Sequence, residues 1–428
     1  MTVAFYTLGC KVNQYETQEM ISVMKDKGYT VVDNKTSADV YVINSCTVTS
    51  ESSRKTRQVV RRFRNTNPDS VIILTGCFPQ AFPEEAACLD EADIILGNKS
   101  NLQIIAAIEE YKKTGSRLVK TTPHHRDDKY CGGKINTFDG HTRAFIKIQD
   151  GCNRYCSYCI IPKARGFSRS RPLDDIKTEL EALASVGYKE VVFVGINLSA
   201  YGLDTGYNLC DALELAENTD GIERIRLGSL EPDHITDEVI RRLSAMKKFC
   251  PQFHLSLQSG CDAILKRMNR HYTSAEYLTL CNKLKAVFPD LSLTTDIIVG
   301  FPGETDENFN DTLEFAKTCG FMKVHVFPFS PREGTVAYKY TDKILNSVKN
   351  QRCAVLQSEC DKIRNKFIDE LVGKTVNVLF ETPKNDTYHG YTENYTPVYV
   401  KSREELCGKI CKVKIISADD ESAFGELI

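Results

Sequence analysis

The chain has 428 residues, of which 42% are hydrophobic and 26% are charged, a balance typical of a soluble globular protein with more than one domain. The formal net charge is −2, so a nucleic-acid partner has to be bound by local basic patches rather than by an overall positive field. The opening residues MTVAFYTLG lack the features of a signal peptide, and no apolar run approaches the roughly 18 residues of a membrane span. We therefore expect a cytoplasmic protein without a membrane segment, whose 17 cysteines are reduced and available as ligands.

Residues 1–130 are predicted to form an N-terminal domain in which strands and helices alternate. Apolar runs at 3–9, 40–45, 71–76 and 93–97 have the length of short buried strands, and helical patterns lie between them. Alternation of this kind predicts a parallel sheet with helices on its faces. The polar stretch that follows, at 121–134, is predicted to be a linker.

A second series of strand and helix patterns belongs to a predicted domain at 138–370. Six apolar strands are expected, at 144–151, 190–197, 224–230, 252–260, 293–300 and 323–330. Amphipathic helical patterns separate most of them. Six β/α units favour a partial barrel, open on one side, with its active-site loops at the C-terminal ends of the strands.

Residues 373–428 show a third pattern, with short strands separated by polar turns and no helical periodicity. This pattern predicts a small all-β barrel. The fold class expected for the whole chain is therefore α/β, with an N-terminal parallel-sheet domain, a central partial (β/α)6 barrel and a small C-terminal β-barrel.

The stretch GCNRYCSYC, at the end of the first predicted barrel strand, carries three cysteines with the spacing C-x3-C-x2-C, namely Cys152, Cys156 and Cys159. Closely spaced thiolates on one loop are typical of iron–sulfur ligation. A zinc site needs a fourth ligand that the following IIPKARG does not supply, and a redox pair needs only C-x-x-C. Chance cysteines in a core are the remaining alternative. We favour a cluster with three protein ligands and one iron open to a small molecule.

A second set of cysteines is distributed along the N-terminal domain. Cys10, Cys46 and Cys77 each stand directly after a predicted parallel strand and each open a predicted helix. Because the C-terminal ends of parallel strands line one edge of a sheet, these side chains are predicted to converge, and helix N-termini favour thiolates. Convergence favours a second cluster, again with one iron open, and chance placement is the alternative.

Five segments together resemble the radical S-adenosylmethionine methylthiotransferases over essentially the whole chain: TLGCKVNQYET (7–17), INSCTVT (43–49), TGCFPQ (75–80), GCNRYCSYCIIPKARGFSRSR (151–171) and DIIVGFPGE (296–304). The resemblance implies a methylthiotransferase domain, a radical barrel and a C-terminal TRAM domain. It also implies two 4Fe–4S clusters, with S-adenosylmethionine as both methyl donor and radical source. The first trio of cysteines would carry the inserted sulfur, the C-x3-C-x2-C trio would cleave the cofactor, and the two open irons would face one another.

The resemblance further assigns positions around S-adenosylmethionine, all near strand ends: Gly195, Asn197, Ser229, Glu231, Gln258, Asp296 and Gly300. The first two match the loop that receives the methionyl amine. The next three would bind ribose or carboxylate, and the last two lie near the expected adenine pocket. Packing within the barrel is the alternative role for each.

Two basic stretches and the C-terminal barrel supply the predicted RNA contacts, namely Arg54, Arg57, Arg61, Arg165, Arg169, Arg171, Lys401 and Lys412. The stretch at 54–64 places its arginines along one helical face, for which a solvated surface is the alternative. The stretch at 163–171 directly follows the C-x3-C-x2-C motif. Residues 373–428 carry more acidic than basic side chains, so this domain is expected to align RNA rather than to supply affinity.

The stretch GCKVNQYET is most similar to the branch of the family that acts on N6-threonylcarbamoyladenosine at position 37 of transfer RNA, beside the anticodon. The expected function is therefore methylthio transfer to C2 of that nucleoside. The expected partners are the tRNA anticodon stem-loop and an electron donor such as flavodoxin or ferredoxin. Alternatives are isopentenyladenosine or a protein side chain as substrate, or, in another class, a non-catalytic iron–sulfur RNA-binding module.

Overall fold

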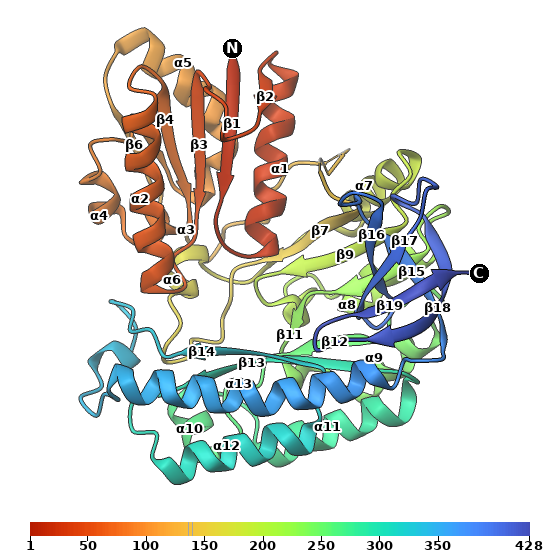
Figure 1. The fold of residues 1–428 in the computed structure, drawn as a ribbon. Helices are drawn as coiled ribbons and strands as arrows, with labels where there is room; N and C mark the ends of the chain where they lie inside the picture. The colour runs from red at the N-terminus through yellow and green to blue at the C-terminus, as the bar shows by residue number, and fades with distance from the viewer. Residues whose placement is uncertain (136, 139) are drawn as a thin grey trace. The chain divides into compact units, whose positions relative to one another are not determined.

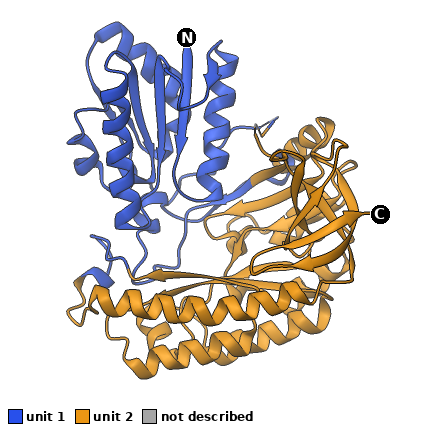
Figure 2. Ribbon diagram, in the orientation of Figure 1, with its two compact units in different colours: residues 1–137, 147–175, 330–338 blue, residues 138–146, 176–329, 339–428 orange. Residues whose placement is uncertain are grey.

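The computed structural model describes residues 1–135, 137–138 and 140–428 (Figure 1). The chain divides into two compact units, shown in Figure 2. The first unit comprises Met1–Thr137, Lys147–Asp175 and Ser330–Tyr338, and the second comprises Phe138–Ile146, Ile176–Phe329 and Lys339–Ile428. All six cysteines of the two predicted cluster sites therefore belong to the first unit.

The first unit is built on a six-stranded parallel sheet with the order β2-β1-β3-β4-β5-β6. Its strands are β1 (Thr2–Thr7), β2 (Thr30–Val32), β3 (Val40–Ser45), β4 (Val71–Gly76), β5 (Ile94–Leu96) and β6 (Leu118–Lys120). Its longer helices are α1 (Lys11–Asp26), α2 (Ser50–Thr66) and α5 (Ile104–Thr114), and α3 (Cys77–Ala81) and α4 (Pro83–Ala87) are short. The predicted parallel-sheet domain is confirmed.

Strand β3 shows why these apolar runs form central strands. Tyr41 and Ile43 belong to one hydrophobic core, and Val40 and Val42 belong to a second. Because successive side chains of a strand point to opposite faces, four successive apolar residues bury both faces of the strand under helices. The predicted linker at 121–134 contains no helix or strand, but it belongs to the first unit rather than standing apart from it.

The barrel strands form two four-stranded sheets with the orders β10-β9-β7-β8 and β11-β12-β13-β14. Their bounds are β7 (Arg143–Asp150), β8 (Arg169–Ser170), β9 (Glu190–Gly195), β10 (Arg224–Leu227), β11 (Ser229–Leu230), β12 (Gln252–Leu255), β13 (Ser292–Val299) and β14 (Lys323–Pro328). The predicted strand at 224–230 is interrupted at Gly228 and appears as β10 and β11. The six predicted strands are thus present in the predicted order, as a partial barrel.

Helices connect most of these strands: α6 (Ile161–Arg165), α7 (Leu173–Ser185), α8 (Leu209–Glu217), α9 (Asp237–Ala245), α10 (Asp262–Arg267), α11 (Ser274–Val287) and α12 (Asp306–Cys319). The long helix α13 (Asn346–Asp369) contacts β14 and α12 (Figure 1). Among the described residues, no helix is both long and apolar enough to cross a membrane.

The C-terminal strands close into a barrel with the order β15-β16-β17-β19-β18, as predicted. They are β15 (Thr375–Phe380), β16 (Thr387–Thr392), β17 (Pro397–Lys401), β18 (Ile410–Ala418) and β19 (Ala423–Leu427). This barrel docks within the second unit through Arg226, which is paired with the buried Glu190 and donates to the carbonyls of Thr392 and Glu393. The ring of Tyr395 lies under the same guanidinium, so this tyrosine is used for docking.

Candidate functional site

Cys10, Cys46 and Cys77 converge at the C-terminal edge of the parallel sheet. Cys10 is the N-cap of α1, Cys46 follows β3, and Cys77 is the first residue of α3. Helix α2 begins at Ser50, so Cys46 lies in the loop before the helix rather than at its first turn. The Oδ1 atom of Asn13 lies 3.6 Å from Cys10 Sγ and 4.0 Å from Cys77 Sγ. The thiols of Cys10 and Cys77 therefore both lie next to the side-chain oxygen of Asn13.

Glycines bring the three loops close enough for this convergence. A Cβ atom on Gly9 would lie 2.9 Å from the Cβ and 3.3 Å from the Sγ of Cys46, which shows that the first loop lies against the second cysteine. Gly76 has a φ of +97°, and a Cβ there would lie 2.5 Å from the carbonyl oxygen of Ser45. Both positions need a residue without a side chain.

Asn13 fixes the loops to one another. Its Nδ2 donates to the carbonyls of Leu8 and Ser45, each over 3.0 Å. Asn44, at the end of β3, donates in turn to the carbonyl of Asn13 over 2.9 Å. Helix α1 is thereby tied to the ends of two strands, which holds the cysteine side chains around a common space.

The C-x3-C-x2-C trio lies on a loop between β7 and α6. The amide of Cys152 donates to the carbonyl of Gly166 over 3.0 Å, and the amide of Cys159 donates to that of Cys156 over 2.9 Å. Gly151 has a φ of +73°, and a Cβ there would overlap the carbonyl of Phe167 at 1.9 Å. The loop is therefore closed onto the segment that follows α6.

Helix α6 connects the two cysteine sets within the first unit. Ile160 and Ala164 pack in the same hydrophobic core as Cys77 and Phe78. At the end of α6, Nε of Arg165 donates to Cys77 Sγ over 3.2 Å. The helix that follows one trio thus contacts a cysteine of the other directly.

Arg165 belongs to a buried network of charges behind Cys77. Its guanidinium pairs with Glu16, and Lys147 lies 2.8 Å from both Glu16 and Asp150. Asp150 Oδ2 also lies 3.5 Å from Arg165 and 3.5 Å from Arg169. Three cations face two carboxylates, so one positive charge is in excess beside the thiols.

The pKa shifts follow from burial and from these pairs. Burial opposes ionisation of Glu16, but Arg165 and Lys147 together hold the pKa of its carboxyl below the usual value. Burial raises the pKa of the Cys77 thiol to about 12, and Arg165 opposes this rise. A buried thiol of this kind is not ionised at neutral pH unless a metal replaces its proton.

The residues therefore fit an iron–sulfur cluster. The donor set is three thiols, of which those of Cys46 and Cys77 are buried and that of Cys10 is exposed. The excess positive charge of the buried network lies beside them and can balance anionic sulfur. Hydrogen bonds to the sulfurs and nearby charge help to set the reduction potential of such clusters.

The structure corrects the prediction for Arg165, Arg169 and Arg171, which we expected to contact RNA. Their exposed fractions are 1%, 7% and 2%, and their guanidinium groups are used inside the protein. Arg171, for example, donates to the hydroxyl of Tyr15 over 3.1 Å. Buried guanidinium groups that already have protein acceptors do not reach phosphates, so these three residues are not assigned to RNA.

The other predicted RNA contacts lie on the surface. Arg54, Arg57 and Arg61 project from α2, with side-chain exposures of 55%, 35% and 58%. Each lies near a carboxylate, of Glu51, Glu85 and Glu91 respectively. Exposed pairs of this kind are weak, so these arginines can exchange their partners for phosphates. Lys401 and Lys412 are exposed on the C-terminal barrel.

The residues expected around S-adenosylmethionine all lie in the second unit. Gly195 ends β9, Asn197 is the N-cap of the next helical turn, and Ser229 begins β11 with its side chain exposed. All three residues thus lie at or next to the end of a strand, and their contacts with S-adenosylmethionine stay a prediction.

The remaining four expected cofactor residues have protein contacts. Glu231 pairs with the buried Arg270. Gln258 has a φ of +69°, and its amide donates to the carbonyl of Asp296. The space that a Cβ on Gly300 would fill is taken by the side chain of Lys349, 2.3 Å away, so the close approach at this glycine is to α13.

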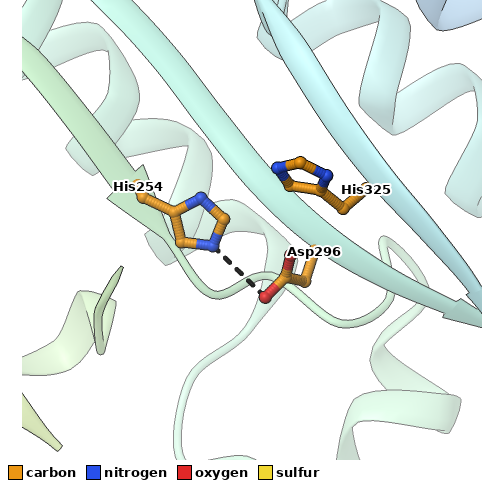
Figure 3. Close-up of side chains that lie close together, drawn as sticks. All are labelled: His254, Asp296 and His325. Carbon is orange, nitrogen blue, oxygen red and sulfur yellow. Dashed lines mark ion pairs between the residues drawn. The ribbon is translucent and has the colours of Figure 1, made fainter. Parts of the chain in front are cut away.

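Sequence reasoning missed two groups of polar residues. Asn13 and Glu16 stand three residues apart on α1, and their placement on one helical face directly after Cys10 was a usable signal. His254 and His325, which lie beside Asp296, had no signal in the sequence because they come from separate strands (Figure 3).

Family models match three successive parts of the chain: the Uncharacterized protein family UPF0004 at residues 2–97, the Radical SAM superfamily at 146–316 and the TRAM domain at 369–428. The threonylcarbamoyladenosine tRNA methylthiotransferase MtaB of Bacillus subtilis (strain 168) is 40% identical over 424 residues, covering 97% of this chain and 94% of that protein. The tRNA-2-methylthio-N(6)-dimethylallyladenosine synthase of Clostridium novyi (strain NT) is 35% identical over 433 residues, covering 99% and 95%.

Among solved structures, the radical S-adenosylmethionine methyltransferase TsrM from Kitasatospora setae superposes with a TM-score of 0.55 at 13% identity, over 90% of this chain and 79% of that chain. This similarity supports the fold alone. The full-length relatives and the radical-domain match confirm the resemblance seen in the sequence, and with it a requirement for a 4Fe–4S cluster and S-adenosylmethionine. The chain belongs to the radical S-adenosylmethionine methylthiotransferases.

Proposed function

We propose that the protein adds a methylthio group to C2 of N6-threonylcarbamoyladenosine at position 37 of transfer RNA, beside the anticodon. The observation that carries this proposal is the presence of two cysteine trios in one compact unit, linked by the hydrogen bond from Arg165 to Cys77. Cleavage of S-adenosylmethionine needs one cluster, so the second set of three thiols is available for a second cluster that carries the inserted sulfur. The 40% identity to the Bacillus subtilis enzyme named for this nucleoside supports the choice of substrate.

In this proposal each trio holds one 4Fe–4S cluster: Cys152, Cys156 and Cys159 the radical cluster, and Cys10, Cys46 and Cys77 the auxiliary one. When bound, the clusters and S-adenosylmethionine supply the radical, the sulfur atom and the methyl group. The residues of the chain bind and orient these groups. Asn13 and Arg165 hold the auxiliary thiols in place, and the excess positive charge of the buried network balances their negative charge.

The cofactor contacts implied by the resemblance form part of the proposal. Gly195 and Asn197 would receive the methionyl amine, and Ser229, Glu231 and Gln258 would bind ribose or carboxylate. Gly300 would lie near the adenine ring through its backbone, since its Cβ position is taken by Lys349. Asp296 would lie near the same adenine pocket.

The partner would be the anticodon stem-loop of a transfer RNA in the cytoplasm. Arg54, Arg57 and Arg61 on α2, with Lys401 and Lys412 on the C-terminal barrel, are the exposed cations assigned to phosphates. Phosphate neutralisation makes such binding salt-dependent. The electron would come from a carrier such as flavodoxin or ferredoxin.

The test is a nucleoside analysis after reaction of the anaerobically reconstituted enzyme with S-adenosylmethionine, a reductant and transfer RNA. Two RNA pools are compared, one carrying N6-threonylcarbamoyladenosine and one carrying isopentenyladenosine. The proposal predicts a methylthio product from the first pool, and none when Cys10 or Cys152 is replaced by alanine. A product from the second pool alone would assign the chain to the dimethylallyladenosine branch. Cofactor cleavage with no methylthio nucleoside from either pool would refute an RNA substrate.

A further inference from the structure

The second unit contains a set of three potential metal ligands, of which the methylthio-transfer proposal uses only Asp296, near the adenine pocket. His254, Asp296 and His325 each offer one ligand atom, and these atoms all lie within 4.8 Å of one another (Figure 3). The three residues come from neighbouring parallel strands, β12, β13 and β14.

The register of the sheet explains why these side chains meet. Asp296 is directly opposite His325, and His254 is opposite Thr294, which stands two residues before Asp296. Because residues two apart on a strand share a face, all three side chains project from the same face of the sheet. The opposite face is apolar: Phe253 packs there against Phe288, directly after α11. The polar cluster is therefore a consequence of strand pairing rather than of loop geometry.

Two contacts fix the ring of His254. Its Nδ1 lies 3.0 Å from the hydroxyl of Thr294, and its Nε2 lies 3.2 Å from Oδ2 of Asp296. The side chain of His254 is 14% exposed and that of Asp296 is 31% exposed. The Nε2 atom is fully buried, yet it makes no hydrogen bond of acceptable geometry with any described group. Metal-binding histidines are commonly oriented by a polar partner at one ring nitrogen, while the other nitrogen binds the metal.

We propose that His254, Asp296 and His325 bind one divalent transition-metal ion of the zinc class. Two imidazoles and a carboxylate are a donor set found in catalytic zinc sites, where a fourth position stays open for water or for an oxygen of a bound molecule. Thr294 then acts as the partner that orients His254. His325 completes the set, and its ring centroid lies 6.0 Å from that of His254.

The test measures zinc in the cluster-loaded, full-length protein. Anaerobically reconstituted protein is incubated with zinc, passed through a desalting column and analysed for zinc and iron. Loaded clusters keep the six cysteines of the two trios occupied, and X-ray absorption at the zinc edge distinguishes nitrogen and oxygen ligands from sulfur of the remaining cysteines. We expect about one zinc per chain with nitrogen and oxygen ligands. Replacement of His254 or His325 by alanine should weaken zinc binding at least about 10-fold while the iron content stays unchanged.

His389→Ala is the matched control, because Nδ1 of His389 lies 3.6 Å from Oε2 of Glu381 in a histidine–carboxylate pair that is not part of such a set of three. This variant should keep its zinc. Should His254→Ala lose iron as well, the exposed His325 carries the test alone. Zinc retained equally by His325→Ala and the wild type, a sulfur-ligated zinc, or no zinc retained by the wild type would each overturn the proposal. None of these outcomes depends on methylthio transfer.

Discussion

Replacement of Arg165 by methionine tests whether the buried charge network supports the auxiliary cluster. The change keeps a long apolar stem but removes the N–H groups that Arg165 donates to Cys77, Asn13 and Glu16. It is best made in a protein whose radical-site cysteines are replaced by alanine, so that all bound iron belongs to the trio of Cys10, Cys46 and Cys77.

The structure sets the expected size of the effect. A hydrogen bond to a charged group contributes about 1.5–3 kcal/mol, or roughly 10- to 150-fold in a binding constant. Two unit charges 3.2 Å apart attract by about 5 kcal/mol at an effective dielectric constant of 20, which is an upper bound. Lys147 and Arg169 remain in the variant, but they are balanced by Glu16 and Asp150. The excess positive charge is therefore lost, and cluster retention should fall by about 10- to 100-fold.

The assay follows iron release during an anaerobic chelator challenge. Arg226→Met is the matched control, because Arg226 is also 1% exposed and pairs with a buried carboxylate, but in the second unit. Arg165→Lys keeps the charge without the planar fork and should give an intermediate rate. If Arg165→Met and Arg226→Met release iron at the same rate as the parent, the network has no role in holding the cluster.

Three further predictions follow from the same structure. Gly76→Ala should abolish iron binding by Cys10, Cys46 and Cys77, because the new Cβ would lie 2.5 Å from the Ser45 carbonyl oxygen. Gly115→Ala is the control: Gly115 also has a positive φ, but a Cβ there meets open space, so iron binding should be kept. Equal iron content in the two variants would contradict the assignment of these cysteines to a cluster. Burial lowers the pKa of His124 to about 4, so the unfolded chain binds more protons below about pH 6.5 and stability should fall by up to about 1.4 kcal/mol per pH unit towards pH 4. Urea unfolding across this window should show a smaller slope in His124→Gln, and an unchanged slope would exclude this histidine as the cause. Replacement of Arg54, Arg57 and Arg61 together by alanine should make the plot of log tRNA affinity against log salt concentration less steep, by a slope change of up to about three. A slope equal to that of the wild type would show that α2 does not contact phosphates.

The fold could be predicted from the sequence where the pattern of apolar residues along a segment was unambiguous. Strand β3 begins with four apolar residues and is buried throughout, and a cysteine or glycine stands at or after the end of such strands, so the parallel sheet and the convergence of Cys10 and Cys77 followed from simple rules. The break at Gly228, which divides one predicted strand into β10 and β11, depends on local backbone geometry that periodicity does not report.

The buried charges could not be predicted in the same way. Arg165 and Arg54 look alike in the sequence, each within a basic stretch, but one is buried against Glu16 and the other is exposed on α2. The difference depends on a partner far away in the chain. His254 and His325 were missed for the same reason, because the register of three strands decides which side chains meet.

The central claim is that the first unit holds two clusters, and iron analysis with Mössbauer spectroscopy after anaerobic reconstitution tests it most directly. The account predicts roughly eight irons per chain in the wild type, and about four in each of two triple variants, one with Cys152, Cys156 and Cys159 replaced by alanine and one with Cys10, Cys46 and Cys77 replaced. A wild type with about four irons, all lost when Cys152, Cys156 and Cys159 are replaced and all kept when the other trio is replaced, would contradict it.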